Sequence, residues 1–124
     1  MSALIHVTPS HIARVSAKEL RELQRAGRPL TIVDVRPVEL QAAGRIPGAV
    51  TLTMAELSDP TNDLRVSGEV VVYCACPNEA SAVIVAKRLM MRGVTRVRPL
   101  SGGLDAWVKA GYDIERHLPT GLTG

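Results

Sequence analysis

Residues 70–82 decide the fold, and they read Val-Val-Val-Tyr-Cys-Ala-Cys-Pro-Asn-Glu-Ala-Ser-Ala. The opening run, Val70 to Tyr73, is apolar enough for a buried strand that helices cover on both faces. A tight loop follows, and a helical pattern then begins near Glu79. A strand, a loop and a helix in this order are typical of an α/β domain with a largely parallel sheet.

This alternation of β-branched runs and amphipathic segments extends along the chain. It predicts a three-layer α/β domain, with a central, mostly parallel five-stranded sheet flanked by helices. The strands are expected at Ile12–Val15, Leu30–Val33, Ala49–Leu52, Val70–Tyr73 and Val97–Leu100. The second and fourth are the most apolar, so we expect them in the middle of the sheet.

Capping signals and glycines place the helices between these strands. Ser16-Ala17-Lys18-Glu19 and Thr53-Met54-Ala55-Glu56 are capping boxes, in which a hydroxyl and a carboxylate satisfy exposed backbone N–H groups. Gly27 is expected to end the first helix, and Pro37 suits the first position of the second. Five helices are expected, at about residues 16–27, 37–44, 53–59, 79–93 and 104–110.

The longest expected helix is amphipathic, with apolar residues spaced at three and four. The residues expected to face the sheet are Ala82, Val83, Ala86, Leu89 and Met90, and those expected to face water are Lys87, Arg88 and Arg92. This pattern places the helix on one face of the sheet.

The length of 124 residues predicts one domain over residues 1–124, with a core at about 12–114 and a fraying tail from Glu115 to Gly124. Hydrophobic residues make up 46% and charged residues 22%, which excludes a disordered chain. With one Trp, two Tyr and no Phe, the chain lacks the aromatic platforms on which bases stack. No nucleic-acid partner is expected.

The net charge is +3, and the basic residues are scattered and form no run. This balance suits a soluble protein without a polyanionic partner. The longest apolar stretches fall short of the ~20 residues that a membrane span needs, and the first residues lack the order of a signal peptide. We therefore expect a cytoplasmic protein without membrane insertion.

Two cysteines, Cys74 and Cys76, are separated by one residue. This number excludes a disulfide scaffold. The histidines His6, His11 and His117 lie near the termini, where they are poorly placed to complete a metal site. No metal is expected, and two thiols this close suggest reactivity.

Cys74 follows the predicted strand at Val70–Tyr73, where sites form in open α/β sheets. Loop amides and the dipole of the following helix would favour a thiolate there. The pKa of Cys74 is therefore expected to fall below the ~8.5 of a free thiol. The alternative is that Cys74 and Cys76 are small buried apolar residues.

Three stretches together resemble a known family. They are Asp34-Val35-Arg36 with Glu39 and Ala43-Gly44-Arg45-Ile46-Pro47-Gly48-Ala49, then Val72-Tyr73-Cys74, and finally Leu100-Ser101-Gly102-Gly103-Leu104-Asp105-Ala106-Trp107. The chain resembles the rhodanese-like (sulfurtransferase) domain over Val15 to about Ile114.

The resemblance implies a persulfide mechanism carried by cysteine, as in covalent catalysis generally. A thiolate takes a sulfane sulfur from a small donor such as thiosulfate or a persulfide and passes it to a cyanide or thiol acceptor. No cofactor is implied. The runner-up function is a catalytically silent module that binds a partner protein or senses redox state.

The loop after Cys74 departs from the family pattern Gly-x-Arg-Ser. The active-site loop is expected to comprise Ala75, Cys76, Pro77, Asn78, Glu79 and Ala80. An acid at Glu79 in place of an arginine would repel anionic donors unless its side chain turns away to cap the helix. We therefore expect Glu79→Arg to increase thiosulfate use. Phosphatase chemistry, which needs a loop arginine, is disfavoured.

The nucleophile is either Cys74 or Cys76. Alignment on the strand selects Cys74, and alignment on the helix selects Cys76. We favour Cys74, because strand register tolerates less slippage than loop length. Cys76 would then be a second, resolving thiol, although the one-residue spacing would strain a disulfide.

Other residues of the motifs receive supporting roles. Asp34 and Arg36 are expected to form a structural or rim pair at the pocket, with a surface ion pair as the simpler alternative. Trp107 is expected in the core, and Arg45 is expected to be solvated. Gly102 and Gly103 are expected to let the backbone approach the cysteine loop.

Overall fold

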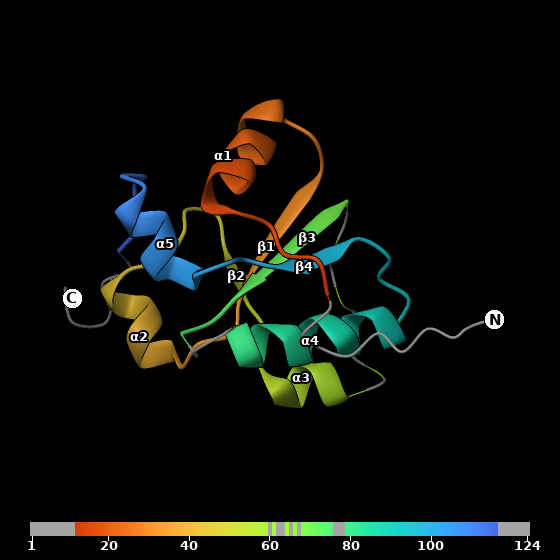
Figure 1. The fold of residues 1–124 in the computed structure, drawn as a ribbon. Helices are drawn as coiled ribbons and strands as arrows, with labels where there is room; N and C mark the ends of the chain where they lie inside the picture. Colours follow the sequence, from red (N-terminus) through yellow and green to blue (C-terminus); the bar gives the residue numbers. More distant parts are fainter. Residues whose placement is uncertain are drawn as a thin grey trace.

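A parallel four-stranded sheet forms the centre of the protein in the computed structural model (Figure 1). The structure describes residues 12–59, 61, 64, 66, 68–75 and 79–116. The strands are β1 (Leu30–Asp34), β2 (Val50–Thr51), β3 (Glu69–Tyr73) and β4 (Val97–Pro99), in the spatial order β2-β1-β3-β4. The α/β class and the central position of β1 and β3 are confirmed.

The register of β1 against β3 fixes the geometry of the site. The two strands pair over five positions, from Leu30 opposite Glu69 to Asp34 opposite Tyr73. Both strands therefore end at the same level, and the residues that follow them share the carboxyl edge of the sheet.

The prediction of a fifth strand at Ile12–Val15 is wrong. Only Val15 pairs, in an isolated parallel bridge with Leu100. Its N–H donates to the Pro99 carbonyl at 2.9 Å, and its carbonyl accepts from the Ser101 N–H at 2.8 Å. Because Ser16 caps the first helix, this pairing cannot extend beyond Val15 toward α1.

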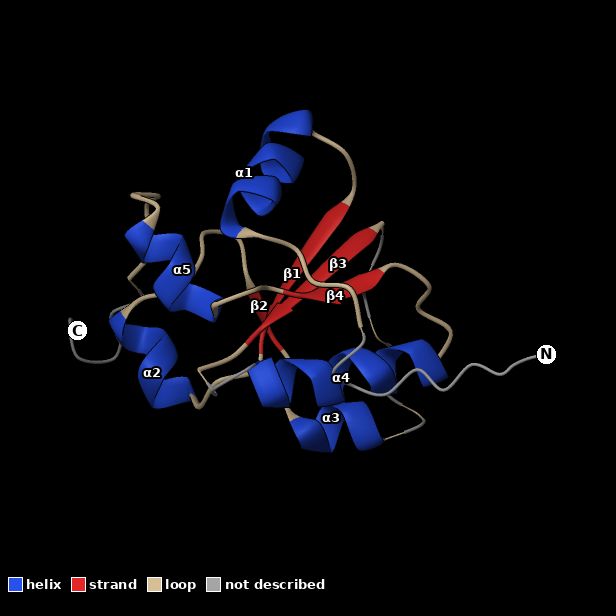
Figure 2. Ribbon diagram, viewed as in Figure 1, coloured by secondary structure: helices blue, strands red, loops and turns tan. Residues whose placement is uncertain are grey.

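The described part of the chain forms five helices, which lie on both sides of the sheet (Figure 2). They are α1 (Ala17–Ala26), α2 (Val38–Ala43), α3 (Met54–Ser58), α4 (Ala80–Met91) and α5 (Gly103–Lys109). Helices α1 and α5 lie on one side, and α3 and α4 lie side by side on the other. No helix in the described part of the chain is long and apolar enough to cross a membrane.

The capping boxes and the glycine stop of the first helix are confirmed, whereas the position predicted for Pro37 is wrong by one residue. In both capping boxes the hydroxyl accepts from the backbone of the glutamate, as between Ser16 and Glu19 at 3.0 Å, and the glutamate accepts in return. Gly27 ends α1 with a φ of 70°, in the left-handed region that glycine adopts without strain. Pro37 precedes the first residue of α2 and does not occupy its first position.

Two apolar clusters, one on each face, divide the side chains of β1 and β3. Ile32, Val71 and Tyr73 pack with α1 and α5, whereas Val33 and Val72 pack with α3 and α4. This follows from the two-residue period of a strand. Most of the predicted inner face of α4 is buried, but Met90 is 41% exposed and Val85, at 2%, takes its place.

Candidate functional site

Cys74 follows β3 directly, at the carboxyl edge of the sheet. The residue is 5% exposed and belongs to the apolar cluster that includes Val33, Val72 and Ala82. Its predicted position at the end of a central strand is thus confirmed. Its burial among aliphatic side chains is what the alternative, a small buried apolar residue, requires.

Only part of the predicted loop can be compared with the structure. Ala75 is exposed, and Ala80 is the first residue of α4. Cys76, Pro77 and Asn78 lie outside the described residues. The choice between Cys74 and Cys76 as the nucleophile stays a prediction.

The paired glycines bring the start of α5 against the cysteine. A methyl group on Gly103 would overlap the carbonyl oxygen of Cys74, and Gly103 has a φ of 56°. A side chain at Gly102 would collide in the same way with Ala106. The expected close approach at Gly103 is therefore confirmed, and both space and backbone conformation favour glycine there.

Glu79, the residue before α4, makes contacts that the sequence did not reveal. Its Oε1 accepts from the Arg14 Nε–H at 2.6 Å, and its Oε2 accepts from the Gly102 N–H at 3.2 Å. Its φ of 54° is the only positive value among the described residues other than glycine. Its side chain makes no capping hydrogen bond to α4, so the alternative in which it turns away to cap the helix is wrong.

The contact with Arg14 changes the net charge expected near Cys74. A lone carboxylate near Cys74 would repel a thiolate and an anionic donor. With Arg14 beside Glu79 the local charge is balanced, and both side chains are largely buried, at 25% and 15% exposure. The two residues are 65 positions apart, and no periodic pattern links them.

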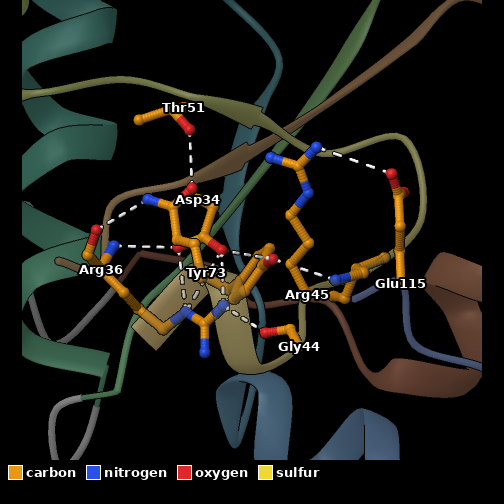
Figure 3. Close-up of polar contacts among 9 residues, drawn as sticks. Asp34, Arg36, Gly44, Arg45, Thr51, Tyr73 and Glu115 are labelled. Carbon is orange, nitrogen blue, oxygen red and sulfur yellow. Dashed lines mark hydrogen bonds and ion pairs between the residues drawn. The ribbon is translucent and has the colours of Figure 1, made fainter. Parts of the chain in front are cut away.

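A buried polar network lies immediately before the cysteine (Figure 3). The Arg36 side chain donates to both Asp34 carboxylate oxygens, with its Nη2 2.8 Å from Oδ2. The Tyr73 hydroxyl donates to the same Oδ2 at 2.7 Å and accepts from the Ile46 N–H at 3.1 Å. The guanidinium of Arg36 also lies 5.3 Å from the centre of the Tyr73 ring.

The network continues into α2 and β2 through buried Gln41. Gln41 Nε2 donates to the Arg36 carbonyl at 2.8 Å, and its Oε1 accepts from the Thr51 hydroxyl at 2.6 Å. Arg36 Nη2 donates to the carbonyl of Gly44 at 2.7 Å. These hydrogen bonds join residues 5 to 10 positions apart, and they give the polar residues of the motif from Asp34 to Ala49 a structural role.

The burial of Asp34 and Arg36 shows whether they form a structural pair or a surface ion pair. Asp34 is 0% exposed and Arg36 8%, so the simpler alternative of a surface ion pair is wrong. They form an internal pair beneath the carboxyl edge and not an exposed rim. Whether the pair shapes a binding pocket stays a prediction.

Burial and hydrogen bonding shift two pKa values in this network. Burial raises the pKa of Tyr73 well above its ordinary value, and the hydrogen bond to Asp34 adds to the effect. Burial also acts to lower the pKa of Arg36, but the hydrogen bond and charge of Asp34 outweigh it, and the pKa is raised. The phenol is therefore neutral and the guanidinium charged at neutral pH.

Arg45 and Glu115 close the other side of the network (Figure 3). Their backbones exchange hydrogen bonds of 2.9 and 2.7 Å, and Arg45 Nη2 lies 3.6 Å from Glu115 Oε2. Arg45 Nε is buried and has no hydrogen-bond partner among the described residues, so the expectation of a solvated side chain is wrong. Glu115 is likewise anchored, and the expected fraying does not begin there.

Trp107 lies in the core as expected, at 2% exposure, with its Nε1–H donating to the Asp113 carbonyl at 2.7 Å. No group of three His, Cys, Asp or Glu side chains is placed to hold a metal ion among the residues that the structure describes. Among the described residues, the chemistry-bearing groups at this edge are the Cys74 thiol and the Arg14–Glu79 pair.

Comparisons with known proteins agree with this geometry. A sulfurtransferase of Allochromatium vinosum is 34% identical over 84 residues, which are 67% of this chain and 76% of that protein. The HTH-type transcriptional regulator Rv0324 of Mycobacterium tuberculosis is 34% identical over 110 residues, 86% of this chain. The chain spans only 46% of that regulator.

The fold gives the same result. The Alr3790 protein from Anabaena sp. superimposes with a TM-score of 0.72 at 26% identity, covering 88% of this chain and 97% of that one. The sequence model of the rhodanese-like domain matches residues 16–110, which include the buried network, Cys74 and the paired glycines. Because this match covers most of the chain, the chain belongs to the rhodanese-like domain family.

Proposed function

We propose that this domain transfers sulfane sulfur through a persulfide on Cys74. The observation that carries the proposal is the position of this thiol at the end of central strand β3, directly before the loop that leads into α4. The match to the rhodanese-like family and the likeness to a protein named sulfurtransferase support it.

With thiosulfate as the donor, the Cys74 thiolate attacks the outer sulfur. A bond forms between these two sulfurs, the sulfur–sulfur bond of thiosulfate breaks, and sulfite leaves with the electron pair. Cyanide or a thiolate then attacks the outer sulfur of the persulfide, and Cys74 leaves as the thiolate. The products are thiocyanate or a new persulfide, and no external oxidant is required.

The surroundings of Cys74 suit such a carrier. Its burial would protect a persulfide from bulk water and from unintended thiols. Arg14 offsets the carboxylate of Glu79, so the loop presents less negative charge to an incoming anion. The close approach of Gly103 to the Cys74 carbonyl fixes the backbone at the nucleophile.

Intact mass spectrometry after incubation with thiosulfate, and separately with a polysulfide, tests the proposal. We expect a gain of one sulfur atom that cyanide removes, that Cys74→Ser abolishes and that Cys76→Ser retains. Loss of the gain in Cys76→Ser with retention in Cys74→Ser would move the nucleophile to Cys76. No gain with either donor would contradict sulfur transfer.

A second candidate function is a protein-binding module without catalysis. The 5% exposure of Cys74 favours it, because a thiol enclosed by aliphatic residues is usually inert. The likeness to a protein named as a transcriptional regulator also favours it. Under this alternative, iodoacetamide would alkylate Cys74 in the native protein far more slowly than in urea, and no persulfide would form.

A further inference from the structure

An open apolar groove of about 570 Å³ separates α3 from α4, on the face away from α1 and α5. Its apolar lining includes Leu57 of α3 together with Ile84 and Met91 of α4. Leu57 is buried, whereas Ile84 is 47% and Met91 84% exposed. Exposed apolar side chains that line a groove are typical of an interaction site.

The exposed residues of α4 form one stripe. Ile84, Lys87, Arg88 and Met91 follow the spacing i, i+3, i+4 and i+7, which places them on one face of a helix. The opposite face of α4 packs into the apolar core, and its residues Val85, Ala86 and Leu89 are buried. Packing within the domain therefore does not account for Ile84 and Met91.

Besides its apolar residues, the groove carries positively charged side chains. Lys87 and Arg88 line it and form no ion pair with any described residue, and Arg92 lines it at the end of α4. Arg92 Nη1 donates to the carbonyls of Leu57 and Asp59 at 3.1 and 3.2 Å, which ties α3 to α4. No acidic residue lines the groove among those that the structure describes. Its charge is complementary to an acidic partner.

A smaller cavity of about 170 Å³ lies next to the groove, on the side of the carboxyl edge of the sheet. The two share Ile84, and the cavity is also lined by Val35 and Leu52, which follow β1 and β2. Cys74 follows β3 at the same edge. A partner seated in the groove would therefore lie beside the candidate site.

We propose that the groove between α3 and α4 binds an amphipathic helix of a partner protein, with an apolar stripe that contacts Ile84 and Met91 and acidic flanks that contact Lys87 and Arg88. This is the helix-in-groove mode of recognition. The unbranched side chain of Met91 adapts to apolar surfaces of different shape. The proposal concerns binding and holds with or without sulfur transfer by Cys74.

A library of helical peptides displayed on yeast tests the proposal. Leucine is fixed at i, i+3, i+4 and i+7, every other position is randomised between Glu and Lys, and cells are sorted for binding of the fluorescent domain. We expect enrichment of Glu over Lys. The enriched peptides should bind Ile84→Asp and the double variant Lys87→Glu/Arg88→Glu at least roughly tenfold more weakly than the native domain.

Matched variants serve as controls. Val108→Asp changes a residue of α5 that is 47% exposed, like Ile84, and Lys18→Glu/Arg25→Glu reverses two charges on α1. Both should bind like the native domain. Absence of Glu enrichment, or enriched peptides that bind Ile84→Asp as tightly as the native domain, would overturn the proposal.

Two other occupants are separate outcomes that also overturn the proposal. One is binding of the domain to anionic vesicles that Lys87→Glu/Arg88→Glu abolishes, without Glu-rich peptides being enriched. The other is self-association in analytical ultracentrifugation that Ile84→Asp abolishes. Because Cys74→Ser leaves the groove intact, peptide binding by that variant separates this proposal from the proposed sulfur transfer.

Discussion

The Nε atom of Arg14 lies 2.6 Å from Oε1 of Glu79, and this contact joins the segment before α1 to the start of α4. Glu79 also accepts from the N–H of Gly102, so one carboxylate links the start of α4 to two other parts of the chain. Glu79, which the alignment on Cys74 predicts in place of the family's arginine, is thus a structural anchor as well as a charge.

A charge swap tests this anchor. Arg14→Glu and Glu79→Arg each place like charges side by side, and we expect each to lower the free energy of unfolding by about 1 kcal/mol, since the pair is only partly exposed. The double variant Arg14→Glu/Glu79→Arg restores opposite charges and should recover most of the loss. Urea unfolding measures all three. A double variant as unstable as the sum of the singles would show that the two side chains do not interact.

The same variants test whether the charge at positions 14 and 79 controls the rate of reaction with thiosulfate. Glu79→Arg adds a cation beside Arg14, so we expect faster persulfide formation from thiosulfate despite lower stability. In the double variant the added arginine is paired with the new carboxylate at position 14, and the rate should return close to that of the native protein. The measurement is the rate of mass gain at a fixed thiosulfate concentration. Equal rates in all variants would show that the net charge of this pair does not control the reaction with thiosulfate.

Gly103 is expected to be the most sensitive glycine near the site. Gly103→Ala combines a left-handed backbone with a methyl group that overlaps the Cys74 carbonyl oxygen. Gly27→Ala is the matched control, because its φ of 70° is similar and no atom lies within 4 Å of the added methyl. The control should cost about 1 kcal/mol, and Gly103→Ala roughly 1–3 kcal/mol more. Equal urea midpoints for the two variants would contradict the close approach.

Local sequence signals predicted the elements well, because their causes are local. The hydroxyl of Ser16 and the carboxylate of Glu19 are three residues apart, and no distant residue is needed to form the capping box. The apolar runs of β1 and β3 likewise determine their own burial. The sequence therefore predicted the central strands, the helix starts and the position of Cys74.

Contacts between distant segments were beyond such signals. The pairing of Arg14 with Glu79 and the contact of Ile46 with the Tyr73 hydroxyl depend on how the helices pack on the sheet. The missing fifth strand has the same origin, since only packing shows that Val15 alone reaches β4. The periodic pattern also predicted wrongly that Met90 is buried. The spacing of three and four fits more than one face of α4, so the period alone does not show which residues face the sheet.

The Asp34–Arg36 pair should dominate stability among the ion pairs. Asp34→Asn removes the charge that compensates buried Arg36, and we expect a loss of about 3–5 kcal/mol. The control Asp105→Asn breaks the exposed pair with Lys109, whose side chains are 74% and 76% exposed, and should cost about 0.5 kcal/mol or less. Similar losses for the two variants, measured by urea unfolding, would show that the buried network carries little of the stability.

Tyr73 should make stability depend on alkaline pH. Burial and the hydrogen bond to Asp34 raise its pKa in the folded protein above the ordinary 10.0. In the unfolded chain the phenol ionises near pH 10, so deprotonation then favours the unfolded state. The stabilisation is therefore complete below about pH 10 and is lost as the pH rises from there toward the folded pKa.

Replacement of each tyrosine isolates this effect. Tyr73→Phe should be less stable at neutral pH, because Asp34 and the Ile46 N–H each lose a partner, but its stability should decline less steeply above about pH 10. Tyr112→Phe, which leaves the network intact, should retain the native decline. The measurement is the free energy of urea unfolding at a series of pH values. If the decline of Tyr73→Phe matched that of the native protein, the raised pKa could not be the cause, and other alkaline groups would have to account for the loss.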